Sequence, residues 1–370
     1  MRAFFDAPAT LIWRGADIVD VCAVDASYGS LLALTADGGL HGVDVSSGAI
    51  KLLCQVVLPT LAPDVEDSAC FGRYGLQLHA SANGEFAAIV VNRGREGLLA
   101  ATASGEIIMR LDGGDYCEGT VPFSAAFVRH AGRDILIHRT AWNRLEASDA
   151  ASGALLTERY IAPNESGQPD PDHYLDYFHG RLYVSPEGGR IFDDGWVWHP
   201  VVVGVTWSLN DWLQKNPWES EDGASRGSFS MRDDWNIPAC WIDEDHLALW
   251  GWADWDDEEF AETSQGSGVC IFDFGASREP AVRRVPMALT GMVSALFSDG
   301  RHVFVVADNG TTVWDIASGL QVAAADFIPL LHDRTRGRLV AWAADSITEW
   351  ALPPVRDAEQ GGTNPTQTAR

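Results

Sequence analysis

Basic residues are scarce in this chain. It carries 26 Lys and Arg against 52 Asp and Glu, a formal net charge of −26, and its only lysines are Lys51 and Lys215. Nucleic acids need a basic surface and anionic membranes attract one, so the charge argues against both as partners. The acidity serves either solubility alone or also the attraction of a basic protein partner.

Long apolar runs are also missing. No stretch approaches the roughly eighteen apolar residues of a membrane span, and residues 1–6 lack the apolar segment of a signal peptide. The cysteines are scattered, without a Cys-x-x-Cys pair: Cys22, Cys54, Cys70, Cys117, Cys240 and Cys270. We therefore expect a cytoplasmic protein with buried, reduced thiols and no zinc site.

Helical periodicity is almost absent. The one short helix we expect spans 209–215, with Asn210 as its N-cap. Elsewhere, apolar runs of four to seven residues are bounded by Asp-Gly or Asn-Gly turns, as in 30–39 and 302–310. This pattern predicts short strands joined by hairpins.

A turn motif recurs along the chain. Segments 42–49, 147–154 and 313–320 each end a strand in Asp, turn through Ser-Gly and begin a new apolar strand. An Asp or Ser side chain caps such a turn, and Gly takes the positive φ that it needs. The closing glycines lie 105 and 166 residues apart. Both spacings are multiples of a period of about 50 residues, which is typical of propeller blades.

The repeats predict an all-β fold, a single seven-bladed β-propeller, with six or eight blades as the alternative. The N-terminal strand 9–13 is expected to complete and close the last blade, which removes a sheet edge. We predict a disordered tail over 354–370. The propeller spans 1–353, with blades near 16–57, 72–112, 121–161, 176–215, 238–282, 290–325 and 326–353.

The repeat motifs resemble those of known propeller families. The run Val-Trp-Asp-Ile-Ala-Ser-Gly at 313–319 resembles the strand end of a WD40 repeat, and the Asp-x-x-Ser-Gly turns resemble those of pyrroloquinoline-quinone-type propellers. The resemblance covers about 9–353 and implies a bacterial WD40-like or quinoprotein-like propeller with a binding surface. The WD40 Gly-His dipeptide is missing. The vicinal cysteines that quinoprotein enzymes carry over their cofactor are also missing, so we expect no cofactor.

Tryptophan and acidic residues concentrate in one region. Ten of the fifteen Trp residues fall between Trp196 and Trp255, and residues 233–262 carry eleven acidic groups and no Lys or Arg. Aromatic side chains are enriched at binding hot spots, and acidic groups steer a cationic ligand. We predict a partner-binding surface on blades four and five, formed by Trp218, Trp235, Trp255, Asp233, Asp234, Asp254, Asp256, Asp257 and Glu258.

This region has a structural interpretation as well. Alternation places Trp196 and Trp198 on one strand face, and Trp250 and Trp252 likewise, where they would fill the space between blades. The acidic cluster is equally typical of a solvated face.

Catalytic motifs are absent. There is no phosphate-binding Gly-rich loop, His-Glu-x-x-His or Gly-x-Ser-x-Gly. One group could form a metal or acid–base site near the propeller axis, although such histidines are commonly structural: His173, His179 and His199, with Asp170, Asp172 and Asp176. We predict no metal site and a non-catalytic protein-interaction propeller. The alternative is a hydrolase or lyase at the central funnel, which requires carboxylates and histidines converging on the axis. A purely structural role is the third option.

Overall fold

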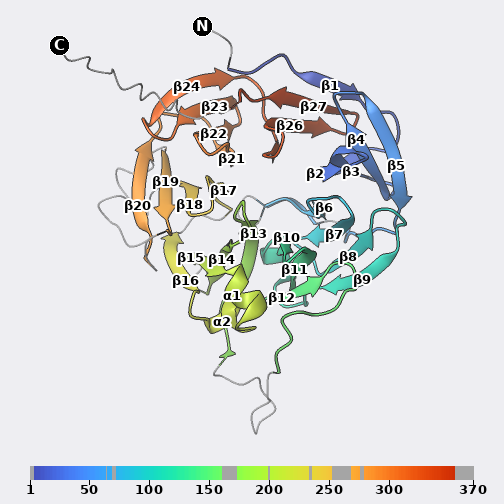
Figure 1. The fold of residues 1–370 in the computed structure, drawn as a ribbon, viewed down its shortest axis with the longest axis vertical. Helices are drawn as coiled ribbons and strands as arrows, with labels where there is room; N and C mark the ends of the chain where they lie inside the picture. The colour runs from blue at the N-terminus through green and yellow to red at the C-terminus, as the bar shows by residue number, and fades with distance from the viewer. Residues whose placement is uncertain are drawn as a thin grey trace, which may run out of the picture.

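The computed structural model describes residues 4–63, 65–68, 72–160, 173–198, 201–232, 236–251, 268–275 and 279–354. Within these ranges the strands form seven antiparallel sheets, six of four strands and one of three. The sheets are arranged in a ring, which Figure 1 shows viewed down its short axis. The chain is therefore a seven-bladed β-propeller, as the repeats predict.

The first three blades are built in chain order. Blade one contains β2 (Ile18–Ala26), β3 (Gly29–Thr35), β4 (Gly39–Asp44) and β5 (Ala49–Gln55). Blade two contains β6 (Gly75–Ala80), β7 (Phe86–Asn92), β8 (Glu96–Ala101) and β9 (Ile107–Asp112). A 3-10 helix, η1 (Glu118–Thr120), precedes blade three, which contains only β10 (Ala125–His130), β11 (Arg133–Ala141) and β12 (Arg144–Asp149).

The other four blades complete the ring. Blade four contains β13 (Phe178–Val184), β14 (Arg190–Val197), β15 (Val201–Ser208) and β16 (Gly227–Arg232). Blade five contains β17 (Ala239–Trp241), β18 (His246–Trp250), β19 (Gly268–Asp273) and β20 (Ala281–Pro286). Blade six contains β21 (Val293–Ser298), β22 (His302–Ala307), β23 (Gly310–Asp315) and β24 (Leu320–Ala325). Blade seven contains β25 (Leu331–Asp333), β26 (Arg338–Ala343), β27 (Ser346–Ala351) and β1 (Ala9–Ile12).

The recurring motif forms the turn between the third and fourth strands of blades one and six, and it follows the third strand of blade three. In blade six, Asp315 Oδ1 accepts bonds from Ser318 N at 2.9 Å and Ser318 Oγ at 2.8 Å, and Gly319 has φ of 67°. These bonds lower the pKa of Asp315 to about 2. Asp44 and Asp149 accept the same kind of bonds in blades one and three. The carboxylate thus holds the turn, as the motif predicts.

The N-terminal strand closes the ring. β1 pairs antiparallel with β27, so the two ends of the propeller share blade seven. Trp13 follows β1; its side chain is 6% exposed, and its indole N–H donates to Ala16 O at 2.9 Å. Arg336 of blade seven then reaches Val24 O at 2.7 Å and Asp25 at 2.8 Å in blade one. Ring closure therefore depends on strand pairing, a buried indole and an inter-blade arginine.

Apolar side chains fill the spaces between blades. One core cluster joins Leu32 and Leu34 of blade one to Ile89 of blade two, and another joins Ile271 of blade five to Val305 of blade six. Every other blade junction, including that between blades seven and one, has its own cluster. Each sheet is therefore covered on both faces by its neighbours over its central strands, which explains why strands such as β3, β7 and β22 are apolar almost throughout.

An insertion interrupts blade four. Our sequence interpretation ended this blade near 215, but its outer strand is β16, which follows α1 (Leu209–Gln214) and α2 (Glu219–Asp222). The predicted N-cap of the first helix, Asn210, is wrong. The cap is Ser208, whose Oγ accepts from Asp211 N at 3.1 Å. Ser208 lies in extended backbone, so its side chain can reach the third helical amide.

The ring has two distinct faces. On one, the links between blades meet the turns between the second and third strands; His179 N, for example, donates to Trp142 O at 3.0 Å. We call this the connector face. The opposite face carries the Asp-x-x-Ser-Gly turns, and we call it the repeat-turn face.

No helix in the described ranges combines the length and apolar character needed to cross a bilayer. We predicted a tail over 354–370, and of these residues the structure describes residue 354 alone.

Candidate functional site

Most of the predicted partner-binding residues lie outside the described part of the chain. Trp218 is the only one of the nine within it. The other eight are Trp235, Trp255, Asp233, Asp234, Asp254, Asp256, Asp257 and Glu258. Their role remains a prediction.

Trp218 lies at the start of α2 and is half-buried. Its ring stacks on His173, with centroids 4.0 Å apart and planes 11° from parallel. The guanidinium carbon of Arg159 lies 5.4 Å from the ring centroid, within cation–π range. Trp218 therefore packs on two side chains of the link between blades three and four.

Arg159 organises a buried ionic network beneath Trp218. Its side chain is fully buried and contacts the carboxylates of Glu146, at 2.9 Å, and Glu221 of α2. It also donates to Leu145 O at 2.7 Å, on β12. Thr157 Oγ accepts from Ala147 N at 3.0 Å on the same strand. The backbone of 154–156 pairs with β12 through a single bridge, Ser148 to Leu155, and these side chains occupy further backbone groups of β12 that a full fourth strand would pair.

The predicted histidine group is divided among separate partners. His173 Nδ1 lies 2.8 Å from Asp222 Oδ2 at the surface, whereas His179 is buried with its Nδ1 2.6 Å from Asp193 Oδ2. Asp176 is exposed. His199, Asp170 and Asp172 lie outside the described residues. In the described ranges, no cluster of three or more His, Cys, Asp or Glu residues is arranged to hold a metal ion.

Polar side chains also occur on the inner strands of the ring. Asp20 of β2 accepts from Val21 N at 2.9 Å and from Leu78 N of β6 at 2.7 Å, so it joins blades one and two. Burial raises its pKa to about 6, against the lowering effect of these bonds and of Arg73 and Arg181. His79 has a pKa lowered to about 4 by burial and by Arg181. Both oxygens of Asp20 are already used by backbone amides.

An aromatic cluster lies on the connector face between blades three and four. Its base is Phe178 stacked on Trp196, with centroids 4.0 Å apart and planes 7° from parallel. The ring centroid of Trp142 lies 4.3 Å from that of Phe178. The ring centroids of Tyr116 and Trp198 lie 6.0 and 5.3 Å from the Phe178 centroid. The ring of Tyr174 packs edge-on against that of Trp142, with centroids 6.4 Å apart. We call these six residues the aromatic surface.

The rim of the aromatic surface is open to solvent. Tyr116, Tyr174 and Trp198 are 50%, 54% and 47% exposed, whereas Phe178 and Trp196 beneath them are buried. Burial, followed by the charge of Asp176 and by Tyr116, raises the pKa of Tyr174. Exposed aromatic rings held on a rigid, buried base are typical of binding surfaces.

Sequence reasoning identified only part of this surface. It assigned Trp196 and Trp198 together to the space between blades, but β14 ends at Val197 and Trp198 projects from the following turn. Trp250 does pack beside a core cluster, as predicted, and Trp252 lies outside the described residues. Tyr116, Trp142 and Tyr174 were missed because they come from two links between blades and from the β11–β12 turn, and only the ring topology brings them together.

The strands that flank the predicted acidic segments also end at the connector face. Trp250 N, at the end of β18, donates to Pro238 O at 2.9 Å, just before β17. Gly251 N donates to Gly268 O at 2.8 Å, where β19 begins. The described residues on either side of 252–267, Gly251 and Gly268, therefore lie on the same face as the aromatic surface, as does Pro238, which precedes β17.

Five cysteines lie in the described ranges: Cys22, Cys54, Cys117, Cys240 and Cys270. Cys54, Cys240 and Cys270 are buried, whereas Cys22 and Cys117 are half-buried, so burial is less complete than predicted. Cys70 lies outside the described residues.

No protein-family model matches the chain, and no curated protein matches it in sequence. Among solved structures it is similar to U3-55K, with a TM-score of 0.53 and 12% identity, over 93% of this chain and 98% of that one. It is also similar to hydrazine synthase from Kuenenia stuttgartiensis, with a TM-score of 0.55 and 11% identity, over 92% of this chain and 96% of that one. BamB from Moraxella catarrhalis aligns at a TM-score of 0.47 and 14% identity, over 90% of this chain and 85% of that one. At such identities the first two comparisons show a shared fold alone.

Proposed function

We propose that this protein is a non-catalytic interaction propeller that binds a basic protein partner on its connector face, at blades three to five. The observation that carries the proposal is the aromatic surface. Two of its exposed rings, Tyr116 and Trp198, pack on the buried stack, and Tyr174 packs on Trp142 beside it, so the rings are held in place before any partner arrives. Preorganised aromatic anchors lose little conformational entropy on binding, which is why they dominate many interfaces.

A basic partner suits both the rings and the charge around them. Arginine and lysine side chains bind the faces of Trp and Tyr rings by cation–π attraction. Asp115, Glu118 and Asp176 are acidic neighbours of the surface rings along the chain, and the net charge of −26 steers cations toward the protein. In this proposal, the acidic and Trp residues predicted in 233–235 and 254–258 extend the binding surface toward blade five.

The test is capture of the partner by affinity-tagged protein from a lysate of the native cell. The double variant Tyr174→Ala/Trp198→Ala should lose at least about 30-fold in affinity, because a hot-spot aromatic contributes about 2 kcal/mol or more. Added salt should weaken capture by the unaltered protein, since the partner is basic. Trp235→Ala/Trp255→Ala tests the extension toward blade five separately.

The matched control is Leu320→Ala/Val322→Ala on β24. These apolar side chains are 66% and 49% exposed but belong to blade six, away from the aromatic surface. This variant should capture the partner as the unaltered protein does, and both double variants should melt within a few degrees of it. Undiminished capture by Tyr174→Ala/Trp198→Ala would show that the aromatic surface is not the binding site.

A further inference from the structure

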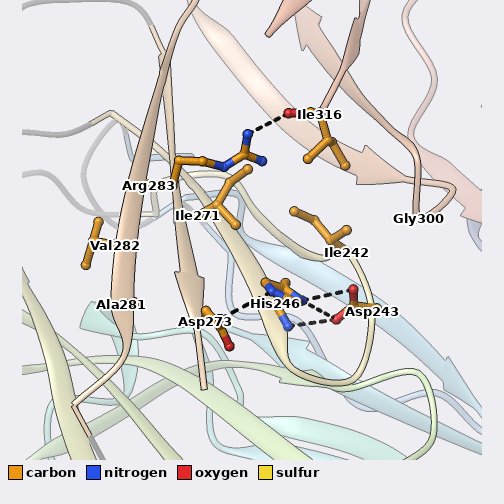
Figure 2. Close-up of a pocket in the computed structure, with 10 residues that line it drawn as sticks. All are labelled: Ile242, Asp243, His246, Ile271, Asp273, Ala281, Val282, Arg283, Gly300 and Ile316. Atoms are coloured by element: carbon orange, nitrogen blue, oxygen red, sulfur yellow. Dashed lines mark hydrogen bonds and ion pairs between the residues drawn. The ribbon is translucent and has the colours of Figure 1, made fainter. Parts of the chain in front are cut away.

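A pocket of about 330 Å³ opens between blades five and six on the repeat-turn face. Figure 2 shows its lining side chains, which come from both blades. Blade five contributes the turn after β17, the start of β18, the end of β19 and β20; blade six contributes Gly300 and Ile316. The pocket is thus separate from the aromatic surface, on the opposite face of the ring.

One end of the pocket is acidic. Asp243 and Asp273 flank His246: the imidazole Nδ1 lies 2.8 Å from Asp243 Oδ1, and Nε2 lies 3.7 Å from Asp273 Oδ2. Burial acts to raise the pKa of Asp243, but hydrogen bonds from His246 and from nearby amides outweigh it and keep that pKa below its usual value. The two carboxylates are 51% and 42% exposed, so a cation in the pocket can reach them.

The other end carries a guanidinium. Arg283 extends from β20, and its Nη1 donates to Ile316 O at 2.7 Å, which fixes the side chain against blade six. This bond engages one of five N–H groups in the planar fork, the geometry that suits a carboxylate. Figure 2 shows Ile271 and Ile242 lying between the guanidinium and the acidic end.

The order of groups defines the ligand. A guanidinium, an aliphatic wall and a pair of carboxylates match a molecule with a carboxylate at one end, a short methylene chain and an ammonium at the other. An α-amino acid places its two charges next to each other and has no methylene chain between them to lie along the aliphatic wall. We propose that the pocket between blades five and six binds an ω-amino carboxylate, with its carboxylate on Arg283 and its ammonium at Asp243 and Asp273.

Isothermal titration calorimetry with 5-aminopentanoate at pH 8 and low salt tests this proposal. We expect saturable binding of one molecule per chain, and at least about tenfold weaker binding of pentanoate and of pentylamine, each of which lacks one charge. Asp273→Asn and Arg283→Gln should each weaken binding by about tenfold or more. Both residues are near the surface, so the variants should keep the melting temperature of the unaltered protein.

Arg129→Gln is the matched control. Arg129 pairs with Asp134 in blade three, far from the pocket, and its variant should bind 5-aminopentanoate unchanged. The proposal is overturned if 5-aminopentanoate shows no saturable binding, if pentanoate or pentylamine binds as tightly, or if the two pocket variants bind like the control. Capture of the protein partner is measured on the other face, so failure here leaves the proposed function standing.

Discussion

Removing the carboxylate of Glu221 should measure how firmly the insertion is attached to blade three. Glu221 is 5% exposed at its side chain and pairs with fully buried Arg159, which joins α2 to β12. In Glu221→Ala, the guanidinium stays buried with one partner fewer. Breaking a buried pair from one side costs about 3–5 kcal/mol, because it leaves an uncompensated charge. Glu146 still contacts Arg159 at 2.9 Å, so we expect the lower end of this range.

The loss should be visible in thermal unfolding followed by circular dichroism. With an unfolding entropy of about 2.1 cal/mol/K per residue, a loss of about 3 kcal/mol lowers the Tm of a chain this size by about 4 °C. Lys215→Ala is the control, since Lys215 pairs with Asp211 in the same insertion but is 67% exposed, and exposed ion pairs contribute little to stability. Equal Tm values for the two variants would refute the view that Arg159 and Glu221 anchor the insertion.

Two further changes test ring closure and the inner strands. Trp13→Ala should lower the free energy of unfolding by about 3–5 kcal/mol, because it leaves a cavity where β1 meets blade one; urea unfolding measures this, and a loss below about 1 kcal/mol would contradict a closing role. Asp20 has a folded pKa raised from 3.8 to about 6, so its stabilising contribution is complete below pH 3.8 and is lost as the pH rises through 6. Relative to the unaltered protein, Asp20→Asn should therefore gain about 2–3 kcal/mol between pH 4 and pH 7 in urea unfolding, and a difference independent of pH would contradict the raised pKa.

The fold was largely predictable because its local chemistry repeats. Asp315, Ser318 and Gly319 make the same turn as their counterparts in blades one and three, and such a turn needs only neighbouring residues. The exceptions are sites where side-chain contacts or an insertion interrupt the regular order of strands. Thr157 and Arg159 stand beside β12 where a fourth strand would pair, and β16 follows a two-helix insertion. Neither the side-chain contacts at β12 nor the insertion before β16 shows as a periodic pattern in the sequence.

The binding surface was less predictable, because composition along the chain does not specify exposure. Trp207 and Trp212 lie in the Trp-rich stretch, yet both are buried in the core between blades three and four. Tyr116 and Tyr174 lie outside that stretch and are among the exposed rings of the aromatic surface. In a propeller, links far apart in sequence meet on one face, so a site is assembled by the closing of the ring. A cluster of tryptophans in sequence therefore locates a region of the ring, while the turn in which each ring lies decides whether a partner can reach it.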